Sequence, residues 1–376
     1  MKLKAAHSVK SFKKNTQKNI FSEIDISLLI GVLVLTVCGL IMVYDASVVQ
    51  AFKDYNDKYF YIKQQIIWAF LGFCALGFFT LFDYRRFKYL AIYIFIFSFF
   101  LLIAVFVPGL GVIAGGAHRW LKLGIITIQP TEIIKAASII FFAALFEKKI
   151  KTSSFLITIG IVTAIMAGLQ KDMGSSIVFF LTAFSIYVVA GARLNYILFF
   201  SPVAILGFIF FVLSSTYRRQ RILAFLDPFS DPQGFSYHIS QVLIALGSGS
   251  WFGLGLGQSR QKFQYIPEVT TDSIFAIVGE EFGFIGSLIL ISLISFLIYR
   301  GFKIAKECNG DFGKLLAVGL TSWLAIQTFI NLGAMVSLIP LTGVPLPFIS
   351  YGGSALLTNL AAVGILLNIS RHNQKI

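Results

Sequence analysis

The chain has 376 residues, of which 57% are hydrophobic and 13% are charged, and its mean hydropathy is +0.83. A water-soluble domain cannot bury this much apolar surface, so the composition excludes a soluble protein and indicates a membrane protein. The net charge of +14 comes from lysines and arginines in short segments beside apolar runs. This pattern is typical of membrane flanks and argues against a nucleic-acid partner.

A transmembrane helix needs about 20 mostly apolar residues. Ten segments fit this requirement, which predicts an all-α polytopic membrane protein of about ten transmembrane helices. We place these spans at residues 26–47, 63–82, 88–107, 131–147, 154–170, 174–191, 196–215, 273–299, 313–335 and 351–370.

Basic residues flank these spans on alternate sides. They occur before the first span and after the second, fourth, sixth, eighth and tenth spans. Because basic residues favour the cytoplasmic side, both termini are predicted to be cytoplasmic. Residues 1–22 then form a basic cytoplasmic tail and residues 23–376 a single membrane domain. The outward-facing loops are 48–62, 108–130, 171–173, 216–272 and 336–350.

Residues 216–272 form the largest outward-facing loop. Ordered loops of this length in compact proteins are usually functional. The loop begins "TYRRQRILAF", and Arg218 and Arg221 there suit an anionic lipid headgroup or a diphosphate, because guanidinium groups bind oxyanions bidentately. The alternative is simple surface charge. The glycine-rich stretch "GSGSWFGLGLGQSRQK" (247–262) lacks the Walker pattern and is predicted to be mobile or closely packed.

The segment "GVIAGGAHRWLKLGIITIQPTEIIK" (111–135) combines a helix start at Gln129-Pro130-Thr131-Glu132 with charges near a span. Lys135 lies about one turn inside the span, where a charge marks a site by default, and Glu132 is its expected partner. Trp120 fits an interfacial anchor.

Three carboxylates stand in "YIPEVTTDSIFAIVGEEFG" (265–283), at and inside the start of a span. Asp272 is either a helix cap or a catalytic acid, and the two roles are compatible. From helix geometry, Glu280 lies roughly 12 Å deeper and about 80° around from Asp272, so that it could face the same cavity. Glu281 is on the opposite side and is expected to pair with a neighbouring helix.

The last outer loop reads "LIPLTGVPLPFISYGGS" (338–354). Prolines at this density cannot continue a regular helix. Non-helical backbone at membrane depth must be buried in protein or line a cavity. The stretch therefore predicts a broken or re-entrant element beside the site.

Several of these motifs together resemble the SEDS proteins (shape, elongation, division and sporulation), over nearly the whole chain. The motifs are "GLIMVYDAS" (39–47), "GGAHRW…QPTEIIK" (115–135), "AGARL" (190–194), "RRQRILAFLDPFSDPQGFSY" (218–237), "GLGLGQSRQKFQYIPEVTTDSIFAIVGEEFG" (253–283) and "PLPFISYGGS" (345–354). The resemblance is closer to the division branch, FtsW, than to the elongation branch, RodA. Lys171, Ser250 and His238 depart from the family's frequent proline, glycine and glutamine.

The resemblance implies a peptidoglycan glycosyltransferase that polymerises lipid II and releases undecaprenyl diphosphate, with Asp272 as the catalytic residue. Residues implied in substrate binding are Arg119, Trp120, Lys135, Arg218, Arg221, Lys262 and Glu280. Cations would stabilise the diphosphate leaving group, and a divalent ion, Mg²⁺ or Mn²⁺, could assist, with Asp272 as a possible ligand. Nearby arginines are expected to lower the pKa of Asp272, which would make it a weaker base and leaves open an orienting role.

Family resemblance also implies a place in the bacterial inner membrane with the active site on the outer face. The implied partners are a class B penicillin-binding protein, which supplies the transpeptidase, and other division proteins. Two other functions remain open. A lipid II flippase would also have polar residues in its spans and broken helices, although its polar lining should cross the full membrane. A scaffold without chemistry leaves Asp272 and Lys135 unexplained.

Overall fold

A computed structural model of the chain describes residues 24–373, apart from 115–116, 125, 149–151, 264 and most of 194–214. The predicted tail 1–22 lies outside the described residues. The predicted span 196–215 also lies largely outside them. The other nine predicted spans each correspond to a long helix in the described part of the chain.

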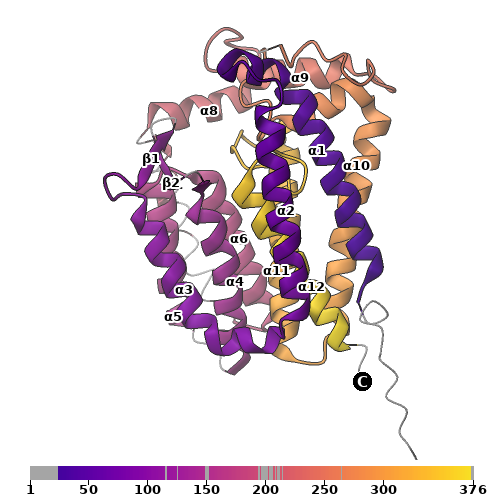
Figure 1. Ribbon diagram of the computed structural model, residues 1–376. Coiled ribbons are helices and arrows are strands. Elements are labelled where there is room, and N and C mark those ends of the chain that lie inside the picture. The colour runs from indigo at the N-terminus through magenta and orange to yellow at the C-terminus, as the bar shows by residue number, and fades with distance from the viewer. Residues whose placement is uncertain are drawn as a thin grey trace, which may run out of the picture.

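These helices form a bundle (Figure 1). Their bounds are α1 (Ile26–Tyr55), α2 (Phe60–Leu81), α3 (Phe87–Ala104), α4 (Pro130–Lys148), α5 (Thr152–Thr163), α6 (Met173–Val189), α10 (Ile274–Glu307), α11 (Asp311–Met335) and α12 (Gly353–Asn373). A π-helical turn, η3 (Ala164–Leu169), extends α5, and a 3-10 turn, η2 (Tyr84–Arg86), precedes α3. In the part of the chain that the structure describes, seven helices, counted with these extensions, are long and apolar enough to cross a membrane. The polytopic helical fold is confirmed, whereas ten spans remains a prediction.

The helices α11 and α12 form the centre of the bundle. In the most apolar 18-residue stretch of each helix, 78% is buried inside the protein for α11 and 83% for α12. The corresponding shares for the other candidate spans are 22–44%. The helix α2 packs along α12, α4 and α6 pack on α11, and α1 packs on α10. Outer helices present their remaining apolar surface to lipid, as a membrane protein requires.

One end of the bundle carries additional elements. Two short helices, α8 (Thr216–Leu226) and α9 (Tyr237–Ser248), lie across this end (Figure 1). The loop 108–130 contains an antiparallel sheet in the order β1 (Gly111–Ala114), β2 (Ala117–Leu123) and β3 (Ile126–Ile128). This small sheet was not predicted, although the loop is rich in the β-branched residues that favour strands.

The glycine-rich segment is built into the hydrogen bonding of α10. That helix breaks at Gly283, which has a φ of 68°. The carbonyls of Glu280 and Glu281 accept from the amides of Leu254 and Gly255, both at 3.0 Å. The amides of Phe284 and Ile285 donate instead to the carbonyls of Ser250 and Trp251. The prediction that this segment is closely packed is thus confirmed.

The predicted break before the last helix is also confirmed. No regular helix forms between Met335 and Gly353, although most of residues 344–350 are buried. Two amides one turn apart on α11 hold this backbone. Asn331 donates to the carbonyl of Val344 at 2.8 Å, and Gln327 donates to that of Pro345 at 3.0 Å. These bonds satisfy irregular backbone at membrane depth.

We expect Gly283→Ala to destabilise the protein strongly. With its ψ of −164°, Gly283 lies in a region that is essentially restricted to glycine, and a side chain there costs about 1–3 kcal/mol. In addition, its Cβ would lie 2.4 Å from the amide nitrogen of Gly253. Thermal unfolding of the purified protein in detergent measures the effect. The control is Gly160→Ala on α5, where no atom lies within 4 Å of the new Cβ. Equal melting temperatures for the two variants would contradict the close approach of 250–255 to α10.

Candidate active site

Asp272 lies in a turn directly before α10, and it is 5% exposed. The residue at the N-cap of α10 is Ser273, and the cap has no side-chain hydrogen bond. Asp272 Oδ1 instead accepts from Thr271 Oγ1 at 3.2 Å. The interpretation of Asp272 as a helix cap was therefore wrong, which leaves its carboxylate available for chemistry.

The broken segment before α12 lies beside this carboxylate. The backbone carbonyl of Asp272 accepts from Asn331 Nδ2 at 2.8 Å, and the same amide group binds Val344. Asp272 Oδ2 would lie 3.9 Å from a Cβ at Gly343, which has a φ of +72°. The carboxylate therefore faces backbone from a distant part of the chain, as expected for a site beside a broken element.

Arg221 is the predicted cation that the structure brings to Asp272. It lies on α8, and its Nη1 donates to the carbonyl of Leu341 at 2.8 Å. Burial raises the pKa of Asp272, and this effect outweighs the hydrogen bond from its own backbone amide, the positive charge of Arg221 and the hydrogen bond from Thr271, which all lower the pKa. The expected lowering of this pKa was wrong, because desolvation is the larger contribution. A carboxylate with a raised pKa is a stronger base.

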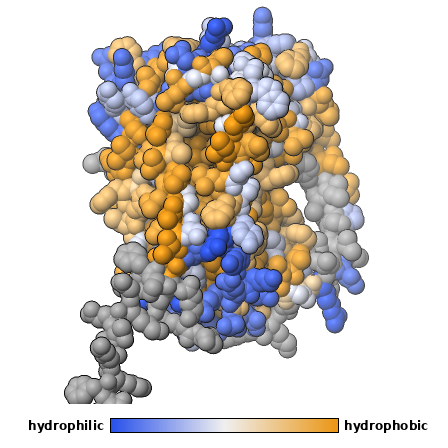
Figure 2. Space-filling view, turned by 90° about the vertical axis from the view of Figure 1, so that its right-hand side faces the viewer, coloured by the Kyte–Doolittle hydropathy of each residue, from blue (hydrophilic) through white to orange (hydrophobic). Residues whose placement is uncertain are grey.

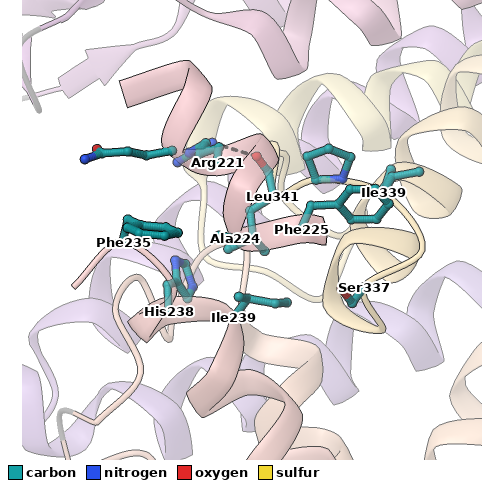
Figure 3. Close-up of a pocket in the computed structure, with 11 residues that line it drawn as sticks. Arg221, Ala224, Phe225, Phe235, His238, Ile239, Ser337, Ile339 and Leu341 are labelled. Atoms are coloured by element: carbon teal, nitrogen blue, oxygen red, sulfur yellow. Dashed lines mark hydrogen bonds between the residues drawn. The ribbon is translucent and has the colours of Figure 1, made fainter. Parts of the chain in front are cut away.

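A cavity of about 150 Å³ opens beside Arg221. Figure 3 shows its walls, which come from α8, from α9 and the segment leading into it, and from the residues that follow α11. His238 contributes to it from α9, and its Nε2 lies 2.7 Å from Ser273 Oγ. Burial and the charge of Arg221 lower the pKa of His238 to about 4, so that the ring is neutral near pH 7. The lining is Gln220, Arg221, Ala224, Phe225, Phe235, His238, Ile239, Ser337, Ile339, Pro340 and Leu341.

Arg119 and Trp120 lie on β2, where Trp120 pairs with Val112 of β1. Arg119 donates to the carbonyls of Gln170 and Lys171, in the turn between η3 and α6. The start of α6 packs closely on residue 342, since a Cβ at Gly174 would lie 2.5 Å from that carbonyl. Arg119 therefore stabilises the turn between η3 and α6, and the helix that follows this turn packs against the broken segment. Arg218 lies on α8, one turn before Arg221.

Lys135 is held in a buried network between α4 and α11. Its side chain is 1% exposed, and Nζ lies 2.7 Å from Glu132 Oε1, which confirms the predicted pair. Nζ also donates to Gln327 Oε1 at 3.2 Å and lies 5.4 Å from the ring centroid of Trp323. Because Gln327 also binds Pro345, Lys135 orients the amide that holds the broken segment.

Lys262 connects the loop in which it lies to the helices α1 and α10. Its Nζ lies 2.8 Å from Asp45 Oδ1 on α1 and 3.0 Å from Glu281 Oε1 on α10, and the side chain is 7% exposed. Burial disfavours the charge of Lys262, but the hydrogen bonds to the two carboxylates raise its pKa. The expected partner of Glu281 on a neighbouring helix is thus replaced by a loop lysine that reaches α1.

Glu280 binds the same loop. Its carboxylate accepts from Ser259 Oγ and from the amides of Arg260, at 3.0 Å, and Gln261, at 3.4 Å. We expected Glu280 to face the same cavity as Asp272, but these bonds direct it to the backbone of 259–261. Substrate binding by Lys135, Lys262 and Glu280 stays a prediction. Asp45 was missed, although a carboxylate near the end of the first apolar segment was a visible signal.

Comparison with known proteins identifies the relationship. Residues 26–375 match the family described as "Cell cycle protein", which groups FtsW, RodA and SpoVE. The chain belongs to this family. Stage V sporulation protein E of Bacillus subtilis (strain 168) is 42% identical over 93% of this chain and 98% of that protein. A probable peptidoglycan glycosyltransferase FtsW of Geobacter sp. (strain M18) is 39% identical over 92% of this chain and 96% of that protein.

Solved structures of similar fold agree. A chain from a structure on the coordination of polymerization and crosslinking by a peptidoglycan synthase complex has a TM-score of 0.76 at 25% identity, over 94% of this chain and 99% of that chain. The rod shape determining protein RodA of Thermus thermophilus has a TM-score of 0.68 at 24% identity, over 94% and 98% of the two chains, and this second likeness concerns the fold alone. The fold of this SEDS protein is thus that of its family.

We expect Lys262→Met to destabilise the protein by about 3–5 kcal/mol, because it leaves two buried carboxylates without their cation. Denaturation in detergent measures the loss, and adding Asp45→Asn should restore part of it. Lys63→Met is the matched control, since Lys63 pairs with Asp57 at the surface, with side chains 64% and 37% exposed. If both lysine variants melt like the wild type, the Lys262 contacts do not hold the loop.

Proposed function

We propose that this SEDS protein is a peptidoglycan glycosyltransferase that polymerises lipid II, a disaccharide-pentapeptide on undecaprenyl diphosphate. The observation that carries the proposal is the buried Asp272 carboxylate, which is not used as a helix cap and has a raised pKa. Relatives at 34–39% identity bear the name probable peptidoglycan glycosyltransferase FtsW. Buried titratable groups with perturbed pKa values are typical of catalytic sites.

In the proposed reaction, the acceptor sugar hydroxyl attacks the anomeric carbon of the donor lipid II. The Asp272 carboxylate takes the hydroxyl proton as the new glycosidic bond forms. The bond from the anomeric carbon to the diphosphate oxygen breaks, and undecaprenyl diphosphate leaves with its negative charge. Arg221, with Arg218 on the same helix, is suitably charged to stabilise that leaving group.

A divalent cation remains an expectation. Among the described residues, no group of three or more His, Cys, Asp or Glu side chains gathers into a metal site. Mg²⁺ commonly binds through one or two carboxylates and the phosphates of its substrate. A Mg²⁺ or Mn²⁺ ion in this protein would therefore be held by Asp272 together with the diphosphate.

We place the protein in the bacterial cytoplasmic membrane with both termini in the cytoplasm and Asp272 on the outer face. The distribution of basic flanks supports this orientation. We also propose a class B penicillin-binding protein as partner. The similar solved chain comes from a peptidoglycan synthase complex that coordinates polymerization and crosslinking.

A role in septal wall synthesis is the first candidate among the processes this family serves. The 42% identity to a stage V sporulation protein E favours wall synthesis during sporulation as the second. Expression in Bacillus subtilis strains that lack either function separates them. Restored septation supports the first role, and restored sporulation without septation supports the second.

We expect Asp272→Asn to reduce polymer formation from lipid II by about 10²–10⁴-fold, as is usual when a general base is lost. Purified protein with its partner is incubated with lipid II, and glycan length is read on a gel. Asp57→Asn, in the outer turn before α2, is a matched control because this aspartate is exposed. Equal product from a folded Asp272→Asn variant and the wild type would refute the catalytic assignment. Transfer of lipid II across liposomes without any polymer would favour a flippase.

The pH dependence tests the electrostatics of the site. A raised pKa means that Asp272 is protonated, and inactive as a base, at a higher pH than an ordinary aspartate, so activity falls on the acid side. Arg221 lowers this pKa, and Arg221→Gln should therefore move the acid limb to higher pH. Arg219→Gln, an exposed neighbour on α8, should leave the midpoint in place. An acid limb that does not move in Arg221→Gln would show that Asp272 does not set it.

A further inference from the structure

The loop that inserts into the break in α10 carries large apolar side chains on its outside. Phe252 is 81% exposed and Trp251 is 65% exposed, and Leu254 and Leu256 are exposed as well. The Trp251 ring packs edge-on against Phe284 of α10, with ring centroids 5.3 Å apart. The loop therefore continues the apolar outer surface of α10.

The position of this loop along α10 indicates its depth. Near the other end of the helix, Arg300 pairs with Asp25 at 2.7 Å, directly before α1 begins, and Lys303 and Lys306 follow. A hydrocarbon layer of about 30 Å corresponds to about 20 helical residues. Counted from Arg300, that layer reaches Glu280, where the hydrogen bonds to the loop begin. The loop thus lies at the opposite boundary of the hydrocarbon layer.

The surface around this helix agrees with that depth. Figure 2 shows the side of the molecule that lies on the right in Figure 1, where α1 and α10 run. Hydrophobic residues cover the middle of this face, and hydrophilic residues gather toward its two ends. Exposed apolar residues of α10 such as Ile289 and Leu288 continue below the loop.

Several backbone polar groups of the loop are hydrogen-bonded inside the protein. Backbone amides and carbonyls of 250–255 bond to α10, and Glu280 accepts from the amides of 260 and 261. Both Glu280 and Glu281 are 1% exposed, so that the loop separates these carboxylates from the outside. Irregular backbone is tolerated at membrane depth only when its polar groups find partners within the protein. Tryptophan, in addition, prefers the membrane interface.

We propose that residues 250–256 form an interfacial anchor that inserts Trp251, Phe252, Leu254 and Leu256 among the lipid acyl chains, just below the headgroups of one leaflet. The occupant of this surface is lipid. The anchor requires only that the chain crosses a membrane and does not rest on the proposed reaction. Because Asp272 follows the anchor by sixteen residues, the anchor would set the height of the Asp272 turn above the lipid.

Spin labels test the anchor. The full chain, with Cys38, Cys74 and Cys308 replaced by serine or alanine, is reconstituted in phosphatidylethanolamine and phosphatidylglycerol vesicles with a label at Phe252→Cys. Collisions with oxygen, which enters lipid, are compared with collisions with a water-soluble nickel complex. Ile289→Cys on α10 is the lipid control, because Ile289 is 64% exposed. Gln233→Cys, in the exposed turn before α9, is the aqueous control.

We expect the ratio of oxygen to nickel collisions at position 252 to resemble that at 289 and to exceed that at 233 several-fold. A ratio at 252 equal to that at 233 would overturn the proposal, since the loop would then lie in water. Low collision rates with both reagents would overturn it as well. They would indicate that a second copy of the chain or another protein covers the loop.

A second readout keeps all three cysteines in place. Wild type and Trp251→Phe are reconstituted in vesicles of brominated lipid, which quenches tryptophan fluorescence in the acyl region. Trp68, Trp120 and Trp323 remain in both proteins, and only the wild type has Trp251. If Trp251 lies among the acyl chains, the wild type should therefore lose a larger fraction of its fluorescence than the variant. An equal or smaller fractional loss in the wild type would contradict insertion of Trp251, even if the cysteine-free protein fails to fold.

Discussion

The half of this protein that contains Asp272 depends on one constraint, which is that backbone leaving helical geometry inside a membrane must find its hydrogen bonds within the protein. Asn331 and Gln327, one turn apart on α11, bind the carbonyls of two consecutive residues in the broken segment. The carbonyls at the break in α10 bind the amides of the glycine-rich loop. Asn331 also binds the carbonyl of Asp272. The same bonds that make the irregular backbone tolerable therefore fix the proposed catalytic carboxylate.

Under this constraint, Asp272, Glu280 and Glu281 have different roles, although they lie within ten residues of one another. Glu280 and Glu281 accept from loop amides, a loop hydroxyl and Lys262, so that both oxygens of Glu280 and Oε1 of Glu281 hold the loop in place. Asp272 is nearly buried, and its carboxylate accepts from the Thr271 hydroxyl and from its own backbone amide. A buried acid with so few donors has a raised pKa. The sparse surroundings of Asp272 suit proton transfer, and the dense surroundings of the two glutamates do not.

Local sequence predicted features with local causes. Apolar runs predicted nine of the described helices, prolines predicted the break before α12, and the spacing of Glu132 and Lys135 predicted their ion pair. The missed ion pair and the wrong pKa direction depend on distant residues. Lys262 binds Asp45, which is 217 residues away, and no local pattern pairs them. The direction of the Asp272 pKa shift depends on burial by α11 and the broken segment, whereas sequence alone showed only the nearby arginines.

Two departures from the SEDS pattern show where family resemblance transfers poorly. Lys171 has a φ of 55°, which the proline frequent at this place cannot adopt. Arg119 donates to the carbonyl of Lys171, so this contact belongs to a turn that proline-containing relatives must build differently. Ser250 has a φ of 48°, a conformation that glycine adopts without cost. The carbonyl of Ser250 accepts from the amide of Phe284 across the break in α10. This hydrogen bond requires the positive φ at position 250, whichever side chain is present there. Residue roles that depend on backbone conformation must therefore be established in each chain, even where side-chain motifs agree.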